Sequence, residues 1–275
     1  MSRRLRGADK RKRTQTVKAV FVIACVASLF VGMSWLYIIA ANANPQLDER
    51  TMCPIEEARI ASLTVLLVDV TDPMNLPQRQ DFINQLHKLA DGIPRFGKLV
   101  ITKVDPVSDQ LLRPVIVICN PGTGADANEW SGNPKKLTDL HQNKFRVPLD
   151  ETFEALSEAS GADRSPIFES IQSVNLTEFQ RMETPGLPRL LVIASDLLQH
   201  TDSISFYKAV PSDQQLVSSA EFDRVRTDLR GIEVELWMLE RADNKKTQPR
   251  ALAELWDFLI ESQNGEVRRL YRISG

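Results

Sequence analysis

A run of 23 residues without a formal charge, from Ala19 to Ala41, constrains this chain more than any other feature. As a helix rising about 1.5 Å per residue, the run is long enough to cross a hydrocarbon core about 30 Å thick. Trp35 and Tyr37 lie near its end, where amphipathic rings favour the membrane interface. The sequence therefore predicts a transmembrane helix at 19–41.

Positive charge is concentrated immediately before this run. Residues 1–18 hold eight Lys or Arg and one acid, whereas the whole chain of 275 residues has a formal net charge of −2. By the positive-inside rule the basic tail 1–18 stays cytoplasmic and the C-terminal part is exported to the periplasm or the cell exterior. We expect a single-pass membrane protein in contact with the lipid bilayer. A cleaved signal peptide is the alternative, because Ala41-Asn42-Ala43 fits a small-x-small site, but signal h-regions are usually about 7–15 residues long.

The exported part is acidic, since residues 19–275 sum to a charge of −9. A nucleic-acid-binding domain needs a basic face, so no nucleic-acid partner is expected. A composition of 43% hydrophobic and 25% charged residues also argues against wholesale disorder. Residues 42–61 are polar, contain two prolines and are predicted to form a linker. Residues 62–275 are long enough for one domain with a full core.

Two apolar runs of strand length indicate the fold class. Leu63–Val70 and Arg189–Ser195 are nearly continuous in Val, Ile and Leu, which is typical of strands covered by helices on both faces. Further strands are expected at Lys98–Val104, Pro114–Cys119, Glu233–Glu240 and Glu266–Ile273, and helices at Gln78–Ala90, Leu149–Ser160, Pro166–Gln180, Ala220–Leu229 and Pro249–Gln263. This alternation predicts a doubly wound α/β domain with a mainly parallel sheet and helices on both faces. Segment 120–147, rich in Gly, Asn and Pro, is expected to be a long loop that either serves function or is a mere insertion.

Both apolar runs end in aspartates. The first is followed by Asp69, Thr71 and Asp72, and the second by Asp196. In a parallel sheet, ligands bind beyond the carboxyl ends of the strands at a topological switch point, so these side chains are predicted to converge there. Each also has a structural explanation: the aspartates could accept turn hydrogen bonds, and Ser165 could cap the helix predicted to start at Pro166.

The order of these motifs resembles that of a known family. D-x-[ST] after a hydrophobic strand, then [ST]-P-I-x-x-[AS]-I at Ser165–Ile171, then S-D after a second strand, is similar to the von Willebrand factor A (vWA) domain. The resemblance covers roughly residues 62–273. It implies a doubly wound α/β sheet with a metal-ion-dependent adhesion site at its rim, where Mg²⁺ or Mn²⁺ would bind.

The resemblance places the metal ligands residue by residue. They would be Asp69, Thr71, Ser165 and Asp196. The second serine of the family's D-x-S-x-S motif falls on Pro73, which has no hydroxyl, so the site is expected to be degenerate. The neighbouring Asp72 is the candidate substitute, because Mg²⁺ requires near-octahedral oxygen coordination.

The cysteines carry a separate prediction. Cys53 and Cys119 are the two thiols of the exported part, and Cys25 lies in the apolar run. In an oxidising compartment a single pair favours a disulfide between Cys53 and Cys119, provided that the fold brings them together.

Other catalytic signatures are absent from the sequence. His87, His141 and His200 show no metal-ligand spacing, and there is no G-x-S-x-G, P-loop or G-x-G-x-x-G motif. The leading interpretation is a non-enzymatic, membrane-anchored protein-binding module whose rim could hold a cation. Two alternatives stay open. Clustered aspartates also suit a metal-assisted phosphoester hydrolase, and Ser28 and Gly32, four residues apart, suit helix pairing in a structural subunit of an envelope complex.

Overall fold

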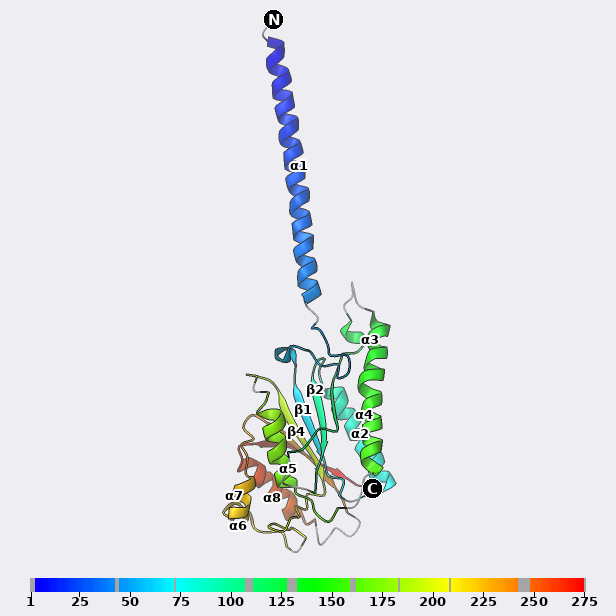
Figure 1. Cartoon of the computed structure of the whole chain (residues 1–275), viewed down its shortest axis with the longest axis vertical. Coiled ribbons are helices and arrows are strands. Elements are labelled where there is room, and N and C mark those ends of the chain that lie inside the picture. The colour runs from blue at the N-terminus through cyan, green and yellow to red at the C-terminus, as the bar shows by residue number, and fades with distance from the viewer. Residues whose placement is uncertain are drawn as a thin grey trace. The chain divides into compact units, whose positions relative to one another are not determined.

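The computed structural model describes residues 3–42, 45–71, 73–106, 111–127, 133–158, 162–182, 184–207, 209–241 and 248–274. The chain divides into two compact units, Met1–Gln46 and Leu47–Gly275. The first unit contains the helix α1 (Arg3–Asn42), drawn in blue in Figure 1.

The helix α1 holds the long apolar run. Its segment Val20–Ile38 is 19 residues long and apolar enough to cross a membrane. Large side chains along it, such as Phe21, Phe30 and Trp35, are exposed instead of packed against protein. The hydroxyl of Ser28 donates to the carbonyl of Ala24, so this polar group is satisfied inside the helix. The segment is therefore suited to contact with lipid.

The second unit is built on a six-stranded sheet with the order β3-β2-β1-β4-β5-β6. The strands are β1 (Leu63–Val68), β2 (Lys98–Lys103), β3 (Ile116–Cys119), β4 (Arg189–Ser195), β5 (Glu233–Leu239) and β6 (Glu266–Ile273). All neighbours pair in parallel except β2 and β3, which pair antiparallel. The mainly parallel sheet that the apolar runs predict is confirmed, with β3 as an antiparallel edge strand.

Helices cover both faces of this sheet, as the continuous apolar strands predict (Figure 1). In β1, Leu63, Val65 and Leu67 pack into one core while Leu66 and Val68 pack into the other. The first core is completed by α5 (Ile167–Val174), α6 (Asp213–Val217), α7 (Ala220–Val225) and α8 (Arg250–Glu261). The second is completed by α2 (Leu76–Gly92) and α4 (Val147–Glu158). The fold is a doubly wound α/β domain, consistent with a vWA fold.

Some elements differ from the sequence prediction. The described part of segment 120–147 is largely helical, with η2 (Gly124–Asp126), α3 (Pro134–His141) and the π-helix η3 (Gln142–Arg146), which runs into α4. Asn133 caps α3 and Pro134 starts it, a signature that the high Gly, Asn and Pro content concealed. The helix predicted at Pro166–Gln180 is α5 followed by the π-helix η4 (Asn175–Phe179).

Residues 47–61, placed in the linker by the sequence, belong to the second compact unit. Leu47 bridges to Pro54, a short 3-10 helix η1 covers Glu57–Arg59, and Ile60 packs into the core. The amide of Cys119 donates to the carbonyl of Thr51, which adds this segment to the edge of the sheet. Cys53 and Cys119 form a disulfide with their Cα atoms 4.7 Å apart. The segment is thereby fixed to the end of β3.

Candidate functional site

The strand order places the candidate residues at one point. Strand β1 lies between β2 and β4. The strands that follow β1 are added first on one side of it (β2, β3) and then on the other (β4, β5, β6), so the topological switch point lies between β1 and β4. Asp69 follows β1 and Asp196 follows β4, and the amide of Asp69 donates to the carbonyl of Ala194. The two aspartates therefore meet at the carboxyl ends of the two central strands, where ligand sites of open α/β sheets occur.

Asp69 is the centre of a buried hydrogen-bond network. Asp69 is only 3% exposed to solvent. Oδ1 accepts from the amide and the hydroxyl of Thr71, at 3.0 and 2.7 Å. Oδ2 accepts from the hydroxyls of Ser165 and Ser195, both at 2.8 Å. Four donors thus satisfy one carboxylate and join three segments of the chain.

Ser165 reaches this network through the backbone. Its amide and carbonyl pair with the carbonyl and amide of His200, both at 2.9 Å, so the loop before α5 is joined to the loop after β4. The alternative that Ser165 is only a helix cap is wrong. Helix α5 begins at Ile167 with Pro166 at the N-cap, and the Ser165 hydroxyl donates to Asp69 instead of capping the helix.

Ser195 joins the site although the sequence did not single it out as a ligand. Its hydroxyl also accepts from the amide of Leu197, at 2.9 Å. Leu197 has a positive φ of 63°, an uncommon conformation for a leucine. The network therefore fixes a tight turn after β4, and the turn aims Asp196 at the rim.

Asp196 is paired with an arginine. Its Oδ2 accepts from Nε and a terminal nitrogen of Arg241, at 3.0 and 2.9 Å, and its Oδ1 accepts from the amide of Leu198, at 2.9 Å. Gln248 supports the pair, donating to the carbonyls of Asp196 and Leu239 and accepting from the amide of Arg241. Burial raises the pKa of Asp196 to about 6; Arg241 opposes this rise and Asp69 adds to it. Arg241 could not be identified as a partner of Asp196 from the sequence, because it follows a different strand, β5.

Two hollows flank the network, which we call the His200 hollow and the Arg241 hollow. The His200 hollow, of about 210 Å³, is lined by Thr71, Ala162, Asp163, Arg164, Ser165, His200 and Tyr207. The Arg241 hollow, of about 330 Å³, is lined by Pro73, Met74, Asn75, Gln78, Leu239, Glu240 and Arg241. Side chains of the network thus reach two open depressions on the same end of the sheet.

The residues present do not fit a divalent cation as they stand. A hard cation needs about six oxygen ligands, yet each oxygen of Asp69 already accepts two hydrogen bonds, and Oδ2 of Asp196 accepts two from a guanidinium. Pro73 supplies no hydroxyl, and Asp72 lies outside the described residues. Within the described ranges, no group of three or more His, Cys, Asp or Glu side chains could hold a metal ion. The ligand set Asp69, Thr71, Ser165 and Asp196 stays a prediction of the resemblance.

The imidazole rings of His87 and His200 pair with groups outside the Asp69 network. Nδ1 of His200 lies 2.9 Å from the hydroxyl of Ser205, and Nε2 of His87 lies 2.7 Å from a carboxylate oxygen of Asp150. The hydroxyls of Ser165 and Ser195 both point to a carboxylate. Among the described side chains, then, the site shows no serine activated by a histidine.

The fold and the network define a class: a doubly wound α/β domain with a polar cluster at its switch point. No protein-family model matches the chain, and no curated protein matches it. Among solved structures, it is similar to an aerotolerance-related membrane protein from Bacteroides fragilis NCTC 9343, solved with multiple mutations to serine, at 14% identity and a TM-score of 0.37, covering 78% of this chain and 92% of that one. It is also similar to the conserved hypothetical protein BatB from Bacteroides thetaiotaomicron, at 11% identity and a TM-score of 0.40, covering 77% and 89%. Similarity at this level assigns no activity or partner to the chain.

Proposed function

We propose that this protein is a single-pass, membrane-anchored binding module that recognises another protein through the rim of its vWA-like domain. The observation that carries the proposal is the network of Asp69. Three buried hydroxyls and one amide donate to its carboxylate and hold the loops of the rim in one arrangement between two open hollows. Buried polar networks of this kind are costly unless every member is satisfied, and when satisfied they fix one geometry. A fixed surface is what recognition of a folded partner requires.

The anchor is the apolar segment of α1. Its length and exposed apolar side chains suit a membrane span, and the basic residues before it favour an N-terminus in the cytoplasm. The domain would then face the periplasm or the cell exterior. A disulfide between Cys53 and Cys119 is compatible with such an oxidising compartment.

The rim carries its own positive charge. Arg241 pairs with Asp196 at the position where the vWA resemblance would place a cation, so recognition in this proposal proceeds without Mg²⁺ or Mn²⁺. A cation at Asp69, Thr71, Ser165 and Asp196 is the alternative. This alternative requires the guanidinium of Arg241 to leave Asp196. Binding of Mn²⁺ by the wild-type protein that is lost in Asp69→Asn would favour it.

An enzyme is the second alternative. A phosphoester hydrolase needs an activated nucleophile or a metal-bound water, and the hydroxyls nearest Asp69 are held as donors to it. Hydrolysis of a generic phosphatase substrate that is lost in Asp69→Asn would overturn the proposal in favour of catalysis.

Site-specific photo-cross-linking in native membranes tests the binding role. A photoreactive residue replaces Tyr207 in the His200 hollow, Met74 in the Arg241 hollow, or Leu176 on η4 as a control. Leu176 is 47% exposed and Tyr207 46%, so exposure is matched, and Leu176 lies beyond the far end of α5. We expect an adduct of one defined mass at Tyr207 and Met74 and none at Leu176. Equal adducts at all three positions, or none at the rim, would refute the proposal.

A further inference from the structure

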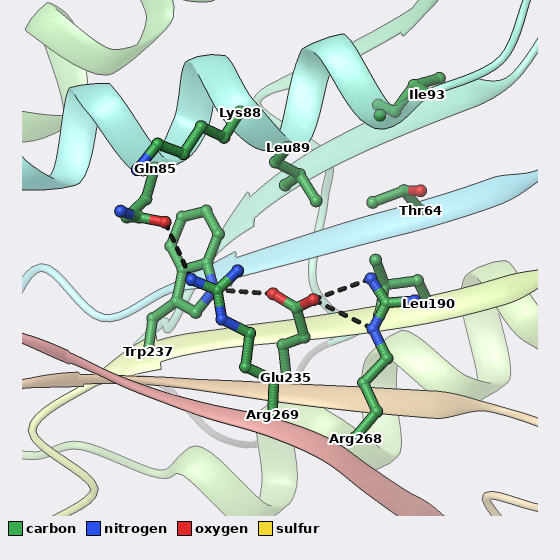
Figure 2. A pocket seen from close by; sticks show the side chains of 11 residues that line it. Thr64, Gln85, Lys88, Leu89, Ile93, Leu190, Glu235, Trp237, Arg268 and Arg269 are labelled. Atoms are coloured by element: carbon green, nitrogen blue, oxygen red, sulfur yellow. Dashed lines mark hydrogen bonds and ion pairs between the residues drawn. The ribbon is translucent and has the colours of Figure 1, made fainter.

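A third hollow lies at the opposite end of the sheet from the rim. It has a volume of about 150 Å³ and lies between α2 and β6 (Figure 2). Its polar lining consists of Thr64, Gln85, Lys88, Glu235, Arg268 and Arg269. We call it the α2–β6 hollow. Thr64 and Glu235 stand near the starts of β1 and β5, whereas Asp69 and Asp196 follow strand ends, so this hollow is separate from the candidate site described above.

An irregularity in β6 puts two consecutive arginines into this hollow. In a regular strand, neighbouring side chains point to opposite faces. Here Val234 pairs with Val267 and Glu235 with Arg269, so Arg268 is an extra residue, a β-bulge. Arg268 and Arg269 both rise from β6 towards α2 in Figure 2. Bulges often re-aim side chains next to functional sites.

A buried glutamate holds the first arginine. Glu235 is 4% exposed; its Oε1 accepts from Nε and a terminal nitrogen of Arg268, at 3.0 and 2.8 Å, and its Oε2 accepts from the indole of Trp237, at 3.0 Å. The carboxylate is thereby satisfied and its charge neutralised. A second carboxylate oxygen, Oε2 of Glu233, accepts from another terminal nitrogen of Arg268 at 2.6 Å. The two carboxylates together therefore hold Arg268 in position.

The other two cations of the lining, Arg269 and Lys88, have fewer hydrogen-bond and ion-pair partners than Arg268. Arg269 donates to Oε1 of Gln85 at 3.3 Å, a long hydrogen bond, and lies over the ring of Tyr271. Lys88 lines the hollow from α2 with its side chain running along the helix towards Gln85, and its ammonium has no partner among the residues that the structure describes. Arg269 and Lys88, both in exposed residues, thus approach Gln85 from opposite walls without a carboxylate of their own.

An apolar wall completes the hollow, with Thr64 next to it. Leu89, Ile93 and Leu190 line the hollow beside it. Small-molecule sites share this composition of apolar wall and few convergent polar groups.

We propose that the α2–β6 hollow binds a small organic anion, a carboxylate with a short aliphatic chain. Arg269 and Lys88 bind the carboxylate, and the chain lies against Leu89, Ile93 and Leu190. Arg268, held by Glu235, positions the wall of the site. The proposal is independent of partner binding at the rim.

Titration calorimetry of the full-length protein in detergent micelles tests the site. The probes are acetate, butyrate and pentanoate, with inorganic phosphate as a second anion. We expect saturable one-to-one binding that tightens with chain length. No binding of any carboxylate, or tighter binding of phosphate than of every carboxylate, would overturn the proposal.

Variants separate a ligand role from a structural one. Arg269→Gln and Lys88→Gln should each weaken pentanoate binding roughly tenfold or more, since each removes a charge-assisted contact. Arg272→Gln is the matched control, because Arg272 is also on β6 but pairs with Glu240 and does not line this hollow. Unaltered pentanoate affinity in both lining variants would refute the assignment.

Discussion

The guanidinium of Arg241 donates through two nitrogens to a single oxygen of Asp196, at 3.0 and 2.9 Å, across 45 positions of sequence. Asp196 follows β4 and Arg241 follows the neighbouring strand β5. A buried carboxylate at the rim is thereby neutralised by a side chain of the same domain.

Replacement of Arg241 by Gln should destabilise the domain at neutral and alkaline pH. The buried carboxylate of Asp196 would lose its counter-ion, and breaking a buried pair typically costs about 3–5 kcal/mol. The loss should be smaller at pH 5, where Asp196 can take up a proton instead. Urea denaturation of the full-length protein in micelles at pH 5 and pH 8 measures both values. Arg164→Gln is the control, since Arg164 also lies at the rim but pairs with the exposed Asp202; equal losses in both variants would contradict the prediction.

The pKa of Asp196 predicts how stability depends on pH. Because the folded state raises this pKa to about 6 from 3.8, it binds the proton more tightly than the unfolded state does. Stability supplied by this group is therefore complete below pH 4 and is lost as the pH rises through about 6, by up to about 3 kcal/mol. Asp196→Asn removes this contribution, so its unfolding free energy should fall less than that of the wild type between pH 4 and 7. Parallel pH profiles of the two proteins would show that Asp196 is not the group responsible.

The hydroxyl of Ser195 should matter for stability although it is remote from solvent. It donates to Asp69 and accepts from the amide of Leu197. Ser195→Ala leaves one carboxylate oxygen and one buried amide short of a partner, which costs about 1–3 kcal/mol. Thermal unfolding monitored by circular dichroism measures the loss. Ser218→Ala, on an exposed helix end, should change the melting temperature little.

Reduction of the disulfide should destabilise the domain by releasing a long loop. Cys53 and Cys119 are separated by 66 residues, and closure of such a loop is worth roughly 4 kcal/mol in the chain-entropy treatment. The double variant Cys53→Ser with Cys119→Ser should unfold at correspondingly lower urea concentration, and added reductant should not lower it further. Cys25→Ser, in the exposed part of α1, should behave as the wild type.

Much of the fold follows from local sequence. The apolar run Arg189–Ser195 predicts β4 with its observed bounds, because a strand covered on both faces carries an unbroken apolar signal. The further strand expected at Glu266–Ile273 is β6 with the same bounds, although most of its residues are exposed. The antiparallel direction of β3 could not be predicted from the sequence, because the residue pattern of a short edge strand is the same for parallel and antiparallel pairing. The bulge at Arg268 is also invisible in sequence, since it exists only relative to the register of β5.

The site divides in the same way. The proximity of Asp69 and Ser165 could be predicted from the sequence, because one stands at a recognisable strand end and the other at a helix start. In the structure the hydroxyl of Ser165 donates to Oδ2 of Asp69 at 2.8 Å. Arg241 could not, because an arginine after a strand is ordinarily solvated, and its partner is set by which strand lies alongside. Ser195 was visible only as the residue before Asp196. Long-range pairing, which local propensity does not encode, therefore decides the charge balance of the rim.

The disulfide described above has a mechanical consequence. Tension applied to the chain from the membrane side reaches Cys53 before it reaches β1. The covalent bond to Cys119 passes part of that load to the outer strand β3, so the central strand is not peeled directly from its start. In the binding role proposed above, the rim would keep its shape while the chain that precedes the domain is under tension.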